Sequence, residues 1–142
     1  MSAGHSFTLL SAGVLFALAT PFVAARELTD EALVIEAARQ YNANAESLIA
    51  KSNDPMNEST FARADGKNLI FYWILRAKKD ISSEKLAEFQ KETFDEIAPR
   101  VCQENAKNEA FHRGMFYTFV YRSRYGQEMA AIVVARDTCS RL

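Results

Sequence analysis

Cysteine and histidine are scarce in this sequence of 142 residues, which contains two of each. Structural metal sites need a cluster of Cys, His or carboxylate ligands, and Cys102 and Cys139 are too far apart for a CxxC motif. We therefore predict no metal site. His112 has Glu109 three positions earlier, and we interpret it as a surface histidine, with a pH sensor or a general base as the alternative.

Neither sign of charge is in excess, because 17 Lys and Arg residues are matched by 18 Asp and Glu residues, for a formal net charge of −1. A nucleic-acid-binding protein needs a basic face that displaces counterions, so we predict no nucleic-acid partner. The balance also gives no support for docking on anionic membranes. A hydrophobic fraction of 49% and a charged fraction of 25% are typical of a globular protein, and the length suits one domain.

The sequence contains no GxSxG, HExxH, P-loop or GxGxxG motif. Carboxylate pairs can perform acid–base chemistry, as in glycosidases. Here Glu92, Asp95 and Glu96 fall on the polar side of a predicted helix, so we expect them to face water. We predict that the protein is not an enzyme and has no catalytic residue and no cofactor; an enzyme is the third function class, after a protein-binding module and a secreted virulence-associated or inhibitor-type protein.

Charge is absent from the first 25 residues, which include no Lys, Arg, Asp or Glu. The apolar run Phe7–Ala19, followed by small residues up to Ala25, is typical of a signal peptide cleaved after Ala25. We predict that residues 26–142 form one exported domain, either periplasmic or secreted, with no stable membrane anchor after cleavage. An uncleaved anchor is the alternative, since Phe7–Ala25 could nearly span a bilayer.

The rest of the chain shows apolar periodicities of helices and strands in alternation. The predicted helices are 27–51, 83–101 and a short 105–113, and the predicted strands are 58–64, 68–76, 115–122 and 127–136. This order predicts an α+β fold with a four-stranded, mostly antiparallel sheet, two main helices and one disulfide.

Several residues mark the ends of these elements. Thr29 and Ser82 or Ser83 are predicted N-caps, and Asp65-Gly66 is a strong hairpin signal. Weak helix formers at Asn42 and Asn44 allow a kink or an early end in the first helix, and Pro99 implies a kink or a new start in the second.

The two cysteines are predicted to form a structural disulfide that ties the end of a helix to the end of the last strand. A catalytic or metal-binding pair is the alternative. Closing a loop of this size contributes roughly 3–4 kcal/mol in the chain-entropy model. Disulfides persist in oxidising compartments such as the bacterial periplasm, which agrees with export.

Aromatic residues are concentrated in the predicted strands, and the strand Leu69–Leu75 is apolar on both faces. One interpretation is a plain core, with one helix on each face of the sheet. The other places both helices on one side, so that an apolar groove on the other side binds a partner. In the second interpretation, Trp73 and Phe71 form the floor of the groove, because aromatic anchors dominate such interfaces. The residues predicted to bind the partner are then Phe71, Trp73, Tyr117 and Phe119.

The segment from Cys102 to Cys139 brackets a short helix, Gly114, an aromatic strand with Tyr117, a turn with Gly126 and the ending Arg136-Asp137-Thr138-Cys139. It resembles the small β-type pilotins of bacterial type II secretion, which have a helix followed by strands and the same disulfide bracket. It is also similar to a wider set of exported domains, including a family described as quorum-sensing-regulated virulence factors. Pilotins of that kind are lipoproteins that accompany a secretin, whereas this chain has no cysteine near its expected cleavage site.

These features together predict a non-enzymatic, periplasmic protein-binding module, a pilotin-like or secretion-associated adaptor. Its partner is expected to be an envelope or secreted protein, with a helix docking on the sheet as one form of binding. The alternative is a secreted virulence-associated or inhibitor-type protein.

Overall fold

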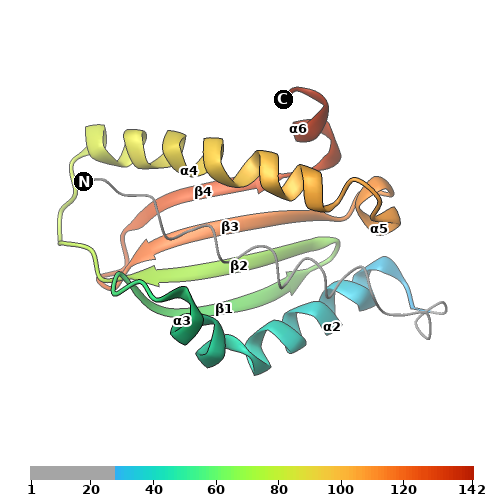
Figure 1. Ribbon diagram of the computed structural model, residues 1–142, viewed down its shortest axis with the longest axis horizontal. Coiled ribbons are helices and arrows are strands. Elements are labelled where there is room, and N and C mark those ends of the chain that lie inside the picture. The colour runs from blue at the N-terminus through green and yellow to red at the C-terminus, as the bar shows by residue number, and fades with distance from the viewer. Residues whose placement is uncertain (1–27) are drawn as a thin grey trace.

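A computed structural model describes residues 28–142 of the chain. The expected signal peptide and its cleavage point lie outside these residues. The elements are α2 (Asp30–Ala43), α3 (Ala45–Ser52), β1 (Asn57–Asp65), β2 (Asn68–Leu75), α4 (Ser83–Glu104), α5 (Glu109–His112), β3 (Phe116–Ser123), β4 (Glu128–Val134) and α6 (Arg136–Ser140). The α+β class, the four strands and the two main helical segments are as predicted (Figure 1).

The four strands form one sheet in the order β1-β2-β3-β4. The two hairpins β1–β2 and β3–β4 are antiparallel, and the central pair β2–β3 is parallel. The sheet is therefore mixed, with two of its three pairings antiparallel. A parallel central pair requires a crossover between β2 and β3, and α4 and α5 provide it.

Helix boundaries follow the capping signals of the sequence. The hydroxyl of Thr29 accepts a hydrogen bond from the Ala32 amide, and the hydroxyl of Ser82 accepts one from the Lys85 amide. The predicted break in the first helix is present at Asn44, which separates α2 from α3. Of the two outcomes predicted at Pro99, a new start is absent, because α4 continues through the proline to Glu104. The buried Val101 after the proline packs in the core and stabilises the last turns.

The end of the chain differs from the prediction of a strand reaching Arg136. β4 ends at Val134 and the chain turns into α6. Thr138 explains this helix, since its hydroxyl accepts a hydrogen bond from the Ala135 amide at 3.1 Å and closes the first turn. The predicted helix over 105–113 is also shorter, with only α5 helical.

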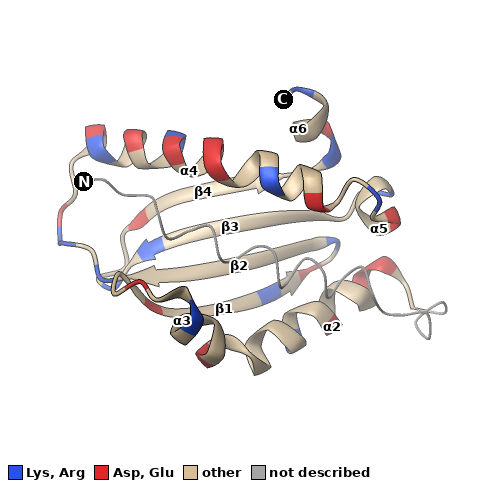
Figure 2. Ribbon diagram, viewed as in Figure 1, with Lys and Arg blue, Asp and Glu red and all other residues tan. Residues whose placement is uncertain are grey.

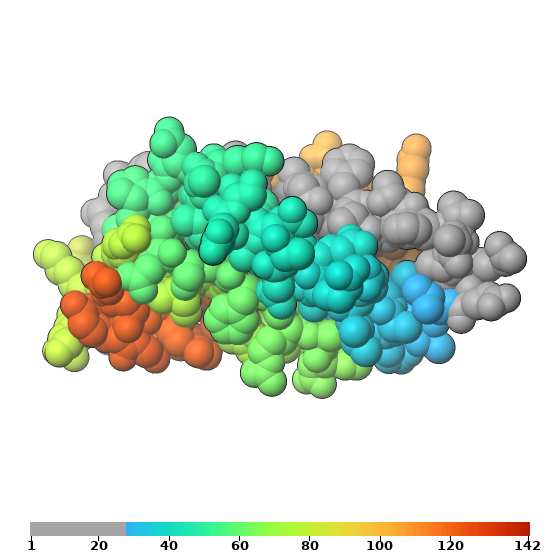
Figure 3. Space-filling view, turned by 90° about the horizontal axis from the view of Figure 1, so that it is seen from below, coloured from blue at the N-terminus to red at the C-terminus, as the bar shows by residue number. Residues whose placement is uncertain are grey.

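Both long helical segments pack on the same face of the sheet. Tyr41 of α2 lies 4.9 Å from Phe71 of β2 between ring centroids, and Phe89 of α4 lies 5.9 Å from Tyr121 of β3. The register places Phe71 and Tyr121 on one side of the sheet. Among residues 28–142, no helix covers the opposite face, and Figure 3 shows α2 and α3 on one side of β1 and β2. The described domain thus has two layers.

Candidate interaction surface

The predicted disulfide is present between Cys102 of α4 and Cys139 of α6, with an S–S distance of 2.02 Å and a Cα–Cα distance of 5.5 Å. Because α6 follows the last strand, the bond joins the end of a helix to the chain just beyond β4, close to the predicted place. It holds α6 against α4 and closes a segment that contains α5, β3 and β4.

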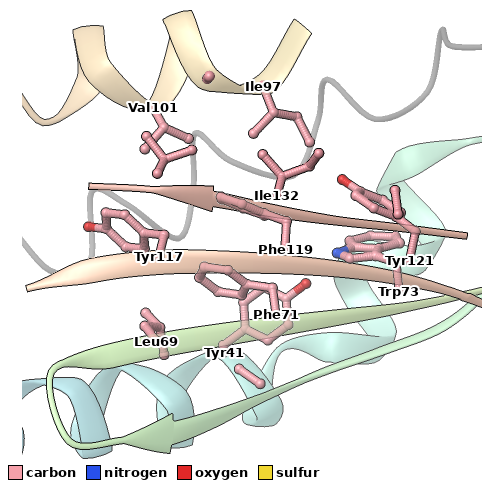
Figure 4. Packing of buried hydrophobic residues seen from close by; sticks show 14 of the residues in the cluster. Tyr41, Leu69, Phe71, Trp73, Ile97, Val101, Tyr117, Phe119, Tyr121 and Ile132 are labelled. Carbon is pink, nitrogen blue, oxygen red and sulfur yellow. The ribbon is translucent and has the colours of Figure 1, made fainter. Parts of the chain in front are cut away.

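The four residues predicted to bind a partner are core residues in the structure. Figure 4 shows them among the side chains between the helices and the sheet. Their exposed fractions are 2% for Phe71, 0% for Trp73, 0% for Tyr117 and 1% for Phe119. The prediction that Phe71 and Trp73 line the face opposite the helices is therefore wrong, because the strand alternation directs them toward α2 and α4.

The uncovered face carries the alternate residues of the same strands. The register pairs Phe61 with Tyr72, Tyr72 with Val120 and Val120 with Ala131, which makes a row across all four strands. The rows on either side of it contain Arg63-Ile70-Thr118-Val133 and Ser59-Ile74-Arg122-Glu128. We call the apolar members of these rows the open-face patch: Phe61, Ile70, Tyr72, Ile74, Val120, Ala131 and Val133.

Aromatic stacking organises the middle of the open-face patch. The rings of Phe61 and Tyr72 are 4.6 Å apart and 12° from parallel. The guanidinium carbon of Arg122 lies 5.4 Å from the centre of the Tyr72 ring, a cation–π contact. These neighbours stiffen a surface that is partly open to solvent, with exposed fractions of 37% for Phe61 and 49% for Val133.

The face that carries the open-face patch also includes polar residues, namely Ser59, Arg63, Thr118, Arg122 and Glu128. Four strands about 4.8 Å apart and about seven residues long cover roughly 400 Å². The apolar part is smaller than this area, because Val120 is only 7% exposed and the rows include charged residues. Contiguous exposed apolar residues on a protein surface are often functional. Charged residues flank the central strands and lie mainly on the helices and at the strand ends (Figure 2).

The other candidate groups have structural partners. A ring nitrogen of His112 lies 2.7 Å from the Ala106 carbonyl oxygen, while a carboxylate oxygen of Glu109 lies 3.8 Å from the Arg113 guanidinium. The ammonium of Lys91 donates to the Asp95 carboxylate at 2.7 Å on the exposed side of α4. Within the described part of the chain, no three His, Cys, Asp or Glu side chains are grouped to hold a metal.

The buried tyrosines remain protonated near neutral pH. Burial raises the pKa of Tyr41, Tyr117 and Tyr121 above the usual value of a phenol. The hydroxyl of Tyr41 is 2.6 Å from that of Thr60, and the hydroxyl of Tyr117 donates to Asn105 at 2.8 Å. These contacts attach the helices to the sheet and serve packing.

The sequence contained a signal for the open-face patch. The strand Leu69–Leu75 was recognised as apolar on both faces, and the prediction chose the face of Phe71 and Trp73 as the binding surface. Both faces of β2 are apolar, so alternation alone could not decide which one faces the helices. Phe61 stacks on Tyr72, and Val133 lies on the neighbouring row; neither was predicted as a site residue.

No helix in residues 28–142 is long and apolar enough to cross a membrane. No protein-family model matches this chain, and no curated protein matches it. A search of solved structures finds a likeness to the type II secretion system pilotin AspS from Vibrio cholerae. The two chains share 18% sequence identity with a TM-score of 0.40, and the alignment covers 72% of this chain and 91% of the pilotin.

Proposed function

We propose that the protein is a non-enzymatic protein-binding module that binds its partner on the open-face patch. The observation that carries this proposal is a four-stranded sheet whose helices cover one face and leave apolar residues on the other. Burying a further apolar surface on Phe61, Tyr72 and Val133 is favourable by about 25 cal/mol per Å² of apolar area removed from water.

The composition of the open-face patch supports binding to a protein. Aromatic side chains are enriched where protein interfaces are strongest, and the stacked pair of Phe61 and Tyr72 lies in the middle row of the patch, on β1 and β2. The rings are held in place by each other and by Arg122, so little side-chain freedom is lost when a partner binds. The charges around the patch are of both signs, so they do not favour binding of a nucleic acid or of an anionic lipid surface.

The disulfide and the expected signal peptide support action in an oxidising compartment outside the cytosol. The disulfide between Cys102 and Cys139 is stable outside the reducing cytosol, and the expected signal peptide would deliver the chain there. The resemblance of the segment from Cys102 to Cys139 to the β-type pilotins favours a secretion-associated adaptor with an envelope protein as partner. A secreted inhibitor-type protein would use the same patch on a target outside the cell.

The test compares capture of partners by the wild type and by open-face variants. Phe61→Asp and Val133→Asp place carboxylates on the patch without touching the core, and Ile35→Asp is the matched control, since Ile35 of α2 is an exposed apolar residue outside the patch. Each protein is cross-linked in periplasmic and supernatant fractions of its native host, and the captured proteins are identified by mass spectrometry.

We expect one dominant partner that is captured by the wild type and by Ile35→Asp, and at least tenfold less by the two open-face variants. Equal capture by all four folded proteins would refute the assignment of the open-face patch. A partner in the envelope fraction supports the adaptor, and one in the supernatant supports the secreted protein. Turnover of the partner or of a small molecule would instead indicate an enzyme.

A further inference from the structure

Both edges of the sheet are closed by a side-chain amide at their middle. On β1, the Asn42 side chain donates from Nδ2 to the Ala62 carbonyl at 2.9 Å, and its Oδ1 accepts from the Ala62 amide at 2.6 Å. On β4, the Gln90 side chain donates to the Ala131 carbonyl at 2.9 Å and accepts from the Ala131 amide at 2.9 Å. Asn42 belongs to α2 and Gln90 to α4, so each long helix closes the edge beside it.

These contacts reproduce the pairing of one residue in an added strand. An edge residue whose N–H and C=O point outward offers both groups to a neighbouring chain, and a carboxamide satisfies both at once. Ala62 and Ala131 lie near the centres of β1 and β4. A further strand would have to displace the amide or lose two hydrogen bonds in the middle of its ladder.

The same two-point contact between a side-chain amide and one backbone residue also occurs away from the strand edges. Gln127 makes the same two-point contact with Ile81, at 3.2 Å and 3.3 Å, and so attaches the loop before α4 to the turn between β3 and β4. Only Asn42 and Gln90 make such a contact with an edge strand in residues 28–142.

We propose that Asn42 and Gln90 are edge guards that prevent a second copy of this chain from adding its edge strand to the sheet. Binding is thereby directed to the open-face patch. The role of Asn42 and Gln90 does not depend on the proposed function, because an unprotected edge strand can pair with a second copy of the chain whether or not the open-face patch binds a partner. Opening one edge allows two copies to pair β1 with β1, or β4 with β4, about a two-fold axis, which closes at a dimer. Opening both edges leaves each copy with two edge strands that can pair, so copies can continue to add and form larger oligomers.

The variants are Asn42→Ala, Gln90→Ala and the double variant, because alanine removes the amide and is the best helix former. Gln40→Ala and Gln103→Ala are matched controls, since these glutamines lie on the same two helices; the Gln40 side chain donates to Glu36 within α2, and Gln103 is exposed. Sedimentation velocity across a range of concentrations measures association, and circular dichroism verifies folding.

We expect each single variant to dimerise at least tenfold more strongly than the wild type, and the double variant to form species larger than dimers. The controls should match the wild type. Folded guard variants that associate no more than the wild type would overturn the proposal.

Amide hydrogen exchange of the wild type gives a second measurement that requires no variant. The amides of Ala62 and Ala131 should exchange at least tenfold more slowly than those of Ala64 and Val133, whose backbone groups point to the same outer sides by strand alternation. Equal rates at these four positions would show that the guards are not formed in solution, and would overturn the proposal.

Discussion

Removal of the Cys102–Cys139 disulfide should lower the stability of the domain substantially while leaving the sheet order unchanged. The bond joins residues 37 positions apart, and the enclosed chain includes two of the four strands. Without it, the unfolded chain gains the freedom of a large open loop, whereas the folded chain keeps its contacts between α4 and β4. The double variant Cys102→Ala/Cys139→Ala tests this effect.

The chain-entropy model gives the magnitude. For a loop of this length the denatured state loses entropy equivalent to about 4 kcal/mol at 25 °C. Small domains are stable by only about 5–15 kcal/mol, so the bond supplies a large share of the free energy of unfolding. For the 115 described residues (142 − 27), the average entropy of unfolding per residue converts this to a fall in Tm of roughly 15 °C.

Urea and thermal unfolding of the oxidised wild type, the reduced wild type and the double variant measure the difference. The two proteins without the bond should agree, and reductant should have no effect on the double variant. A loss below about 1 kcal/mol would refute the reasoning, because it would mean that the unfolded chain already keeps these segments together. Two free thiols in the unreduced, unfolded wild type would remove the bond itself.

Two further predictions concern an ion pair and the faces of the sheet. The hydrogen bond from Arg113, 2.7 Å from Asp30, lowers the pKa of the Asp30 carboxyl, so its stabilisation is present above the unfolded pKa near 3.8 and is lost as pH falls through the folded value. Asp30→Asn should therefore cost about 0.5–1 kcal/mol at pH 7 and progressively less as the pH falls below the unfolded pKa, measured by urea unfolding, and a constant cost would contradict the pairing. Ile132→Lys should cost about 3–5 kcal/mol, because it buries a charge under α4, whereas Val133→Lys should stay within about 0.5–1 kcal/mol. Equal losses at these adjacent positions would contradict the assignment of the two faces.

Local signals in the sequence were sufficient for the four strands and the two long helical segments, but not for α6. Side chains that cap helices and a glycine that turns a hairpin act within a few residues of their own position. Thr29 and Ser82 cap the helices as predicted, and Gly66 adopts a positive φ of 59° in the predicted β1–β2 turn. The cysteine pair was also predictable, because only two cysteines were present.

Pairing over long distances was beyond the reach of these signals. The parallel contact between β2 and β3 depends on where α4 returns the chain, and the prediction gave no pairing for the central strands. The side chain of Thr138 starts α6 through a single hydrogen bond, which apolar periodicity does not register. The edge contact between Asn42 and Ala62 spans 20 positions and depends on how α2 lies over β1.

The failure to choose the correct face of β2 is itself informative about function. A sheet with one face covered by helices normally alternates apolar residues toward the helices with polar residues toward water. In β2 the positions on the face away from the helices are Ile70, Tyr72 and Ile74. Because these residues are also apolar, the sequence of β2 shows no polar face that would identify the side toward water. Apolar residues that stay in water add nothing to the stability of a fold. This composition agrees with the proposed function, in which a partner supplies the second layer on this face.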